Sequence, residues 1–126
     1  MFNNNRICSC IGSFVLAFTA MTAGGSALAR TPFDGDWSVV IATSNGSCAA
    51  SYRFGVQITN GSVTYDGGMV NLQGRVTSKG AAQVAVRSGS QWANGYGRLT
   101  KTRGGGAWRG QGTSGSCSGT WIAERR

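Results

Sequence analysis

The sequence contains no histidine, and only four of its 126 residues are acidic. Without an imidazole there is no Ser-His-Asp or Cys-His arrangement and no metal site built on histidine ligands. The four carboxylates belong to Asp34, Asp36, Asp66 and Glu124. We therefore expect a protein that is not an enzyme, that needs no cofactor and that holds no catalytic metal.

The pair Asp34 and Asp36 is the one acid–base arrangement to consider. In a strand, residues i and i+2 lie on the same face about 7 Å apart, and this separation is compatible with glycoside hydrolysis. Asp-Gly-Asp in front of a strand is also ordinary turn chemistry, because aspartate side chains bond to nearby backbone amides. We favour the turn.

Proline is nearly absent, with one residue, whereas glycine supplies 21. No stretch after residue 30 has a helical period. Short alternating runs are instead separated by glycine-containing turns, a pattern typical of many strands in a tightly curved sheet. The chain is therefore predicted to be all-β. The alternation predicts eight strands, over residues 37–43, 49–59, 62–65, 69–77, 81–87, 91–100, 107–112 and 116–124.

Two local signals sharpen this prediction. In the second strand Tyr52, Phe54, Val56 and Ile58 alternate with polar residues or glycine. Asn60-Gly61 follows directly and is a strong signal for a two-residue hairpin turn. The glycine-rich run at 102–106 is predicted to be a loop.

Short turns between successive strands favour an antiparallel meander. A meander of eight strands avoids exposed edges best by closing on itself, so we predict a small closed barrel. A two-sheet β-sandwich is the alternative. In a barrel the last strand pairs with the first, which brings Cys48 and Cys117 together and predicts a disulfide between them.

The first 29 residues have the pattern of a secretory signal. Arg6 precedes an apolar run at Ile11–Met21, and Ala27-Leu28-Ala29 is a small-x-small cleavage site. The apolar run is too short for a membrane span, which needs about 20 residues. We expect cleavage after Ala29, removal of Cys8 and Cys10, one domain over residues 30–126 with no transmembrane segment, and export to the periplasm or the medium.

Glycines also share faces with bulky residues in two neighbouring strands. Gly95 and Gly97 alternate in phase with Leu99, and Gly110 is in phase with Trp108. Faces without side chains let a small barrel curve, or let a bulky neighbour lie over them.

Two resemblances bear on the fold. Gly35-Asp36-Trp37 at the start of the first strand resembles the lipocalin and avidin type of barrel, in which an arginine near the last strand packs over the tryptophan. Arg125 is the residue that would do so here. The chain is short for a lipocalin, whose cup needs longer strands to enclose a ligand.

The second resemblance covers nearly all of residues 30–126. The frame Phe33–Trp37, Cys48, Asn60-Gly61 and Cys117–Trp121, ending in Ala123–Arg126, resembles a group of small exported proteins of alphaproteobacteria, notably rhizobia. This likeness implies export but no mechanism.

The net charge of +8 favours contact with polyanions. Trp92, Tyr96 and Arg98 fall on one face of the sixth strand, with Trp108 and Arg109 one strand away, and aromatic rings among cations suit acidic polymers. These five residues are the predicted ligand site, for an acidic polysaccharide or an anionic lipid surface.

Other interpretations stay open. Trp92, Tyr96, Trp108 and Trp121 could simply fill the core. The protein could instead inhibit a secreted hydrolase through the loop at 101–106, or be a structural envelope protein without a discrete ligand. The sequence predicts no oligomeric state.

Overall fold

The computed structural model describes residues 31–65 and 67–126, so the predicted signal segment 1–29 lies outside the described residues. In this part of the chain all regular structure is β-strand, which confirms the all-β prediction. The eight strands are β1 (Gly35–Asn45), β2 (Ser51–Thr59), β3 (Ser62–Thr64), β4 (Asn71–Val76), β5 (Ala81–Ser88), β6 (Gln91–Leu99), β7 (Arg103–Gly112) and β8 (Gly115–Arg125).

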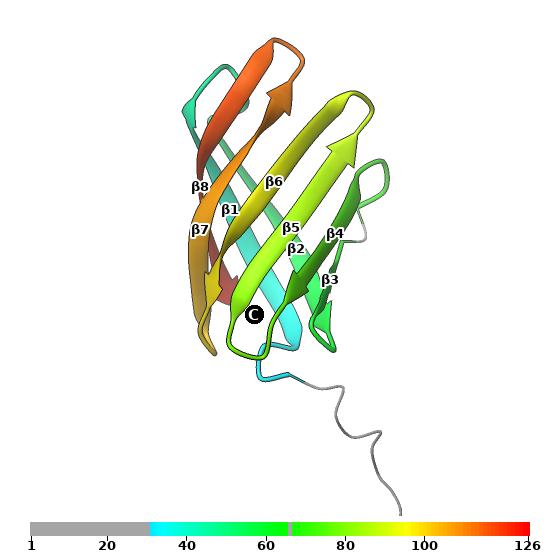
Figure 1. The fold of residues 1–126 in the computed structure, drawn as a ribbon, viewed down its shortest axis with the longest axis vertical. Helices are drawn as coiled ribbons and strands as arrows, with labels where there is room; N and C mark the ends of the chain where they lie inside the picture. The colour runs from blue at the N-terminus through cyan, green and yellow to red at the C-terminus, as the bar shows by residue number, and fades with distance from the viewer. Residues whose placement is uncertain (1–30, 66) are drawn as a thin grey trace, which may run out of the picture.

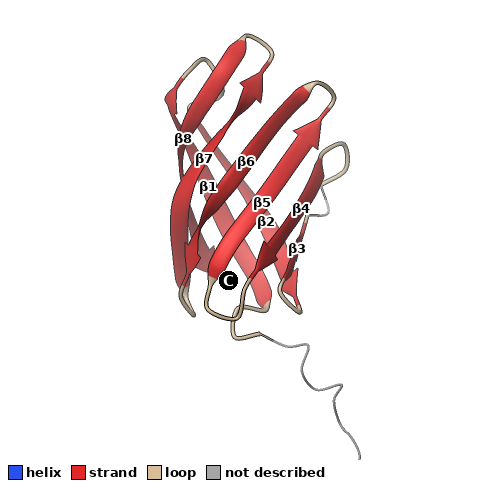
Figure 2. Ribbon diagram, viewed as in Figure 1, coloured by secondary structure: helices blue, strands red, loops and turns tan. Residues whose placement is uncertain are grey.

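The strands form a closed barrel in which each strand pairs antiparallel with its neighbours in the chain (Figures 1 and 2). The seam between β1 and β8 closes the sheet, with Trp37 opposite Arg125 and Ala42 opposite Thr120. The barrel is therefore confirmed and the sandwich is not observed. No helix in residues 31–65 and 67–126 has the length and apolar character needed to cross a bilayer.

The predicted loop at 102–106 is wrong, because β7 begins at Arg103. Its three glycines pair with β6 on one side and with β8 on the other. A Cβ atom added at Gly106 would lie 2.9 Å from Nε1 of Trp121, and one added at Gly97 would lie 2.7 Å from the same indole. The Trp121 ring lies against Gly106 and Gly97, whereas a Cβ atom at Gly104 would meet the Leu99 side chain, so the run is a strand packed closely against its neighbours.

The fully buried core lies at one end of the barrel, which we call the packed end. It contains Phe33, Trp37, Ile58, Val63, Val76, Ala82, Leu99 and Ala123. Trp37 is only 1% exposed, and its indole N–H donates to the carbonyl oxygen of Phe33 at 2.9 Å. Both the C-terminus and the segment that leads into β1 lie at this end (Figure 1).

Arg125 covers the packed end. Its guanidinium carbon lies 4.8 Å from the centre of the Trp37 ring. The same guanidinium donates to the carbonyl oxygens of Pro32 (2.7 Å), Asp34 (2.6 Å) and Lys101 (2.7 Å). The predicted contact between Arg125 and Trp37 is confirmed, and the arginine also ties three chain segments together.

Asp34 acts in a turn, as its sequence context predicts. Its carboxylate accepts hydrogen bonds from the Thr31 hydroxyl and from the backbone amides of Asn60 (2.8 Å) and Gly61 (3.2 Å). These bonds, the one from Thr31 first, lower the pKa of Asp34. Asn60 and Gly61 both have positive φ, 54° and 81°, as the two central residues of a type I′ hairpin turn require.

The disulfide Cys48–Cys117 lies at the opposite end, which we call the stapled end. Its Cα atoms are 6.1 Å apart and its sulfur atoms 2.07 Å apart. The bond joins the segment after β1 to the start of β8, so it crosses the seam of the barrel as predicted.

Candidate functional site

The outer face of β4–β7 carries the surface on which most of the predicted site residues lie. The strand register aligns outward side chains in rows across the strands. One row contains Arg75, Gln83 and Tyr96, from β4, β5 and β6. The next row contains Gln73, Ala85, Asn94 and Arg109, from β4 to β7. We call these two rows the outer groove, because they line a concave region of about 800 Å³ together with Ser62 and Thr64.

The charged residues within strands β3 to β7 all carry a positive charge. Strands β3 to β7 contain Arg75, Arg87, Arg98, Arg103 and Arg109 and no acidic residue. Within residues 31–65 and 67–126 the one ion pair joins Arg103 to Glu124, at 3.7 Å between exposed side chains. The guanidinium groups of Arg75 and Arg109 therefore have no carboxylate partner in the described chain, so they are available to an external anion.

Two of the predicted aromatic residues are exposed beside these arginines. Tyr96 is 52% exposed and Trp92 is 38% exposed, both on the outer face of β6. Arg98 lies on the same face and donates to the carbonyl oxygen of Lys79 at 3.4 Å. Trp92, Tyr96 and Arg98 therefore share an exposed face of β6, and their role in ligand binding stays a prediction.

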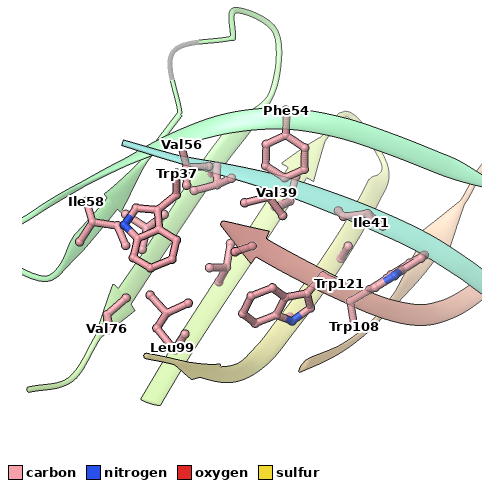
Figure 3. Close-up of a pocket in the computed structure, with 18 residues that line it drawn as sticks. Trp37, Val39, Ile41, Phe54, Val56, Ile58, Val76, Leu99, Trp108 and Trp121 are labelled. Atoms are coloured by element: carbon pink, nitrogen blue, oxygen red, sulfur yellow. The ribbon is translucent and has the colours of Figure 1, made fainter. Parts of the chain in front are cut away.

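Trp108 does not belong to this surface, which corrects the predicted set. Neighbouring residues in a strand face opposite sides, so Arg109 points outward and Trp108 points into the barrel (Figure 3). Trp108 is 9% exposed, and its indole N–H donates to the carbonyl oxygen of Ala42 at 3.1 Å. Trp121 also faces the interior. Of the four aromatic residues considered for the core, Trp108 and Trp121 therefore lie inside the barrel, and Trp92 and Tyr96 lie on its outer face.

Sequence reasoning missed Arg75, Gln73 and Gln83. Alternation alone predicts that these residues face away from Leu72 and Val76. It does not predict that Arg75 lies in one row with Tyr96, because that placement depends on two strand registers. Arg75 could have been included in the predicted site, because it is a cation on the predicted outer side of the fourth strand.

The segment proposed for hydrolase inhibition is much shorter than predicted. Since β7 begins at Arg103, the connection from β6 consists of Thr100, Lys101 and Thr102. The Thr100 amide and the Thr100 hydroxyl both donate to the carbonyl oxygen of Arg103, which closes the turn. This tight turn offers no projecting loop for insertion into an active-site cleft.

The comparisons with known proteins add no assignment: no family model, no curated protein and no solved structure matches the chain. No group of three or more His, Cys, Asp or Glu residues suited to a metal ion is present in the part of the chain that the structure describes.

Proposed function

We propose that this protein is an exported, non-enzymatic binding module that holds an acidic polysaccharide along the outer groove of β4–β7. The observation that carries the proposal is the row of Arg75, Gln83 and Tyr96 beside Arg109, on strands that contain five arginines and no carboxylate.

The chemistry of the groove suits a chain of acidic sugars. Neighbouring strands lie about 4.8 Å apart, so Arg75 on β4 and Arg109 on β7 are roughly 14 Å apart across the sheet. Each guanidinium can take a carboxylate or sulfate through two parallel hydrogen bonds. Gln83 and Asn94 between them offer amide donors and acceptors for hydroxyl groups, and the exposed Tyr96 ring can pack against the apolar face of a sugar.

The distribution of exposed apolar residues favours a polymer over a lipid surface. Among residues 31–65 and 67–126, the large exposed apolar side chains are Tyr52, Met69, Trp92, Tyr96 and Ile122. Tyr52 lies on β2, Trp92 and Tyr96 lie on β6, and Ile122 lies on β8. Because these three strands are not neighbours in the barrel, the side chains do not form one patch that could enter a bilayer. A polar groove lined by cations instead fits a flexible anionic chain. Export is supported by the signal-like N-terminal pattern and by the Cys48–Cys117 bond, which suits an oxidising compartment.

The proposal is tested with polygalacturonate, measured by calorimetry at about 20 and 200 mM salt. Replacing two arginines of the groove, Arg75→Gln with Arg109→Gln, should weaken binding by about tenfold or more, since each charge-assisted hydrogen bond is worth about 1.5–3 kcal/mol when desolvated. Wild-type affinity should fall as salt rises, because screening weakens exposed ion pairs.

The matched control removes the same charge elsewhere: Arg53→Gln with Arg126→Gln, which lie on β2 and after β8. It should lose much less affinity than the groove variant. Equal losses in the two variants, or an affinity that does not change with salt, would contradict the proposal. So would binding to vesicles of phosphatidylserine and phosphatidylcholine without binding to polygalacturonate.

A further inference from the structure

The interior of the barrel retains a cavity of about 100 Å³ between the packed end and the stapled end (Figure 3). We propose that this cavity is a second binding site, independent of the outer groove, for a small uncharged hydrocarbon such as a single aromatic ring. All eighteen residues that line the cavity are aliphatic, aromatic or glycine.

The cavity offers no polar side-chain group to a ligand, because the indole N–H groups of the three tryptophans in its wall donate to backbone carbonyl oxygens. The indole of Trp37 donates to Phe33 O at 2.9 Å, that of Trp108 to Ala42 O at 3.1 Å, and that of Trp121 to Tyr96 O at 3.3 Å. Where neighbouring strands pair, the main-chain groups of the wall are engaged in the barrel ladder. A charged or strongly hydrogen-bonding molecule would lose its hydration without compensation, so the site selects apolar, uncharged ligands.

The wall cannot easily collapse into this space. Apart from residues 51–56 of β2 and 71–73 of β4, the barrel strands are paired on both sides, and the Trp121 ring lies against the backbone at Gly97 and Gly106. Ala93 and Gly95 on β6 contribute little side-chain volume to the same cavity. For scale, an engineered apolar cavity of about 150 Å³ stays dry and binds benzene or xenon. A volume near 100 Å³ therefore limits the ligand to about the size of one ring.

One part of the wall is closed by side chains and not by backbone hydrogen bonds. Because β3 has only three residues, β2 pairs with it only at residues 57–59, and β4 pairs with it only at residues 74–75. Among the described residues no strand lies between residues 51–56 of β2 and residues 71–73 of β4. Phe54 and Leu72 line the cavity there, and the Phe54 ring packs 5.7 Å from Tyr52 and 5.5 Å from Tyr65, centre to centre. Rotation of these side chains gives a small molecule a path inward without breaking the ladder.

The test uses the oxidised protein and benzene as the probe. At a benzene concentration ten times its Kd, the melting temperature should rise by about 5 °C or more, since binding to the native state alone raises stability. In NMR spectra, benzene protons should show intermolecular NOEs to the inward methyl groups of Val56, Leu72 and Val84, and none to the outward Val40 and Ile122. Benzoate, which has the same ring with a charge, should give neither effect.

A matched pair of variants separates the cavity from the surface. Val84→Phe fills the cavity and should abolish the benzene NOEs and the rise in melting temperature, whereas Ile122→Phe, which faces outward on β8 and lies outside the outer groove, should keep both. If Val84→Phe does not fold, the wild-type NOEs decide. NOEs confined to outward methyls, no NOEs at all, or equal effects of benzoate would overturn the proposal. The benzene experiments do not depend on polygalacturonate binding, so the cavity proposal can fail while the groove proposal holds, and the reverse is also true.

Discussion

The two ends of the barrel are closed by different means. At the packed end, eight residues form one buried cluster and Arg125 covers it with three hydrogen bonds to backbone carbonyls. At the stapled end, the inward residues Ile41, Phe54 and Val86 remain only partly buried, and the Cys48–Cys117 bond joins the strands across the seam.

This difference shows that the two ends of a small barrel can be stabilised by different interactions. A domain of about 100 residues has few apolar side chains with which to fill a cylinder. Here they are concentrated at the end where the chain enters and leaves the barrel. The cavity extends from this cluster toward the other end, where Ile41, Phe54 and Val86 line it and the disulfide joins the strands.

The largest effect is expected at the packed end. Trp37→Ala removes the most buried side chain and should lower the free energy of unfolding by about 3–5 kcal/mol. Ile41→Ala, on the same face of β1 but at the half-buried stapled end, should cost about 2 kcal/mol or less. Urea unfolding with equal m-values measures both. Equal losses would show that the two ends are packed alike.

Removal of the staple comes next. The bond joins residues 69 positions apart, and the chain-entropy model gives such a loop about 4 kcal/mol. The double variant Cys48→Ser with Cys117→Ser should show this loss in urea unfolding. Hydrogen exchange should accelerate first in residues 41–53 and 115–119, and least around Trp37 and Ala123. Uniform acceleration along the chain would mean that the bond does not act on one end.

The smallest effect is a pH dependence at the packed end. Because the pKa of Asp34 in the folded state lies below the ordinary value of 3.8, its contribution to stability is complete above pH 3.8 and is lost as the pH falls through the lowered pKa. The gap in melting temperature between wild type and Asp34→Ala should therefore be constant from pH 7 to 5 and narrow below 3.8. Asp34→Asn keeps an acceptor but cannot ionise, so its gap should narrow too. A gap that widens on acidification would contradict this account.

Much of the fold could be predicted from the sequence because each strand signals itself locally. The alternation in β2, the Asn60-Gly61 turn and the phase of Gly97 with Leu99 are all properties of a few neighbouring residues. The loop assigned to 102–106 was wrong for a long-range reason. Gly104 and Gly106 lie against Leu99 on β6 and Trp121 on β8, and no local pattern in that run reveals these neighbours.

The candidate site was less predictable, for the same reason. Trp92, Tyr96 and Arg98 share a face because of period-two alternation within β6, so they could be grouped correctly. Arg75 joins them only through the registers of β4, β5 and β6, which depend on the whole sheet. Trp108 was grouped with Arg109 because both lie one strand away from the Trp92 face, although adjacent residues of a strand point to opposite faces. The cavity could not be predicted at all, since it is a property of volumes summed over every strand.

The seam between β1 and β8 also determines the order in which the chain can fold. Every other pairing joins strands that follow one another and can form early, whereas the seam joins Trp37 to Arg125 and closes the longest loop in the molecule. During synthesis a nascent chain that lacks β8 can at most form an open sheet of seven strands, whose two edges, on β1 and β7, are free to pair with other chains. Secretion of the chain before folding, or a chaperone that holds it, would protect those edges until β8 arrives. β8 is thus the strand that pairs with both β1 and β7 and closes the barrel.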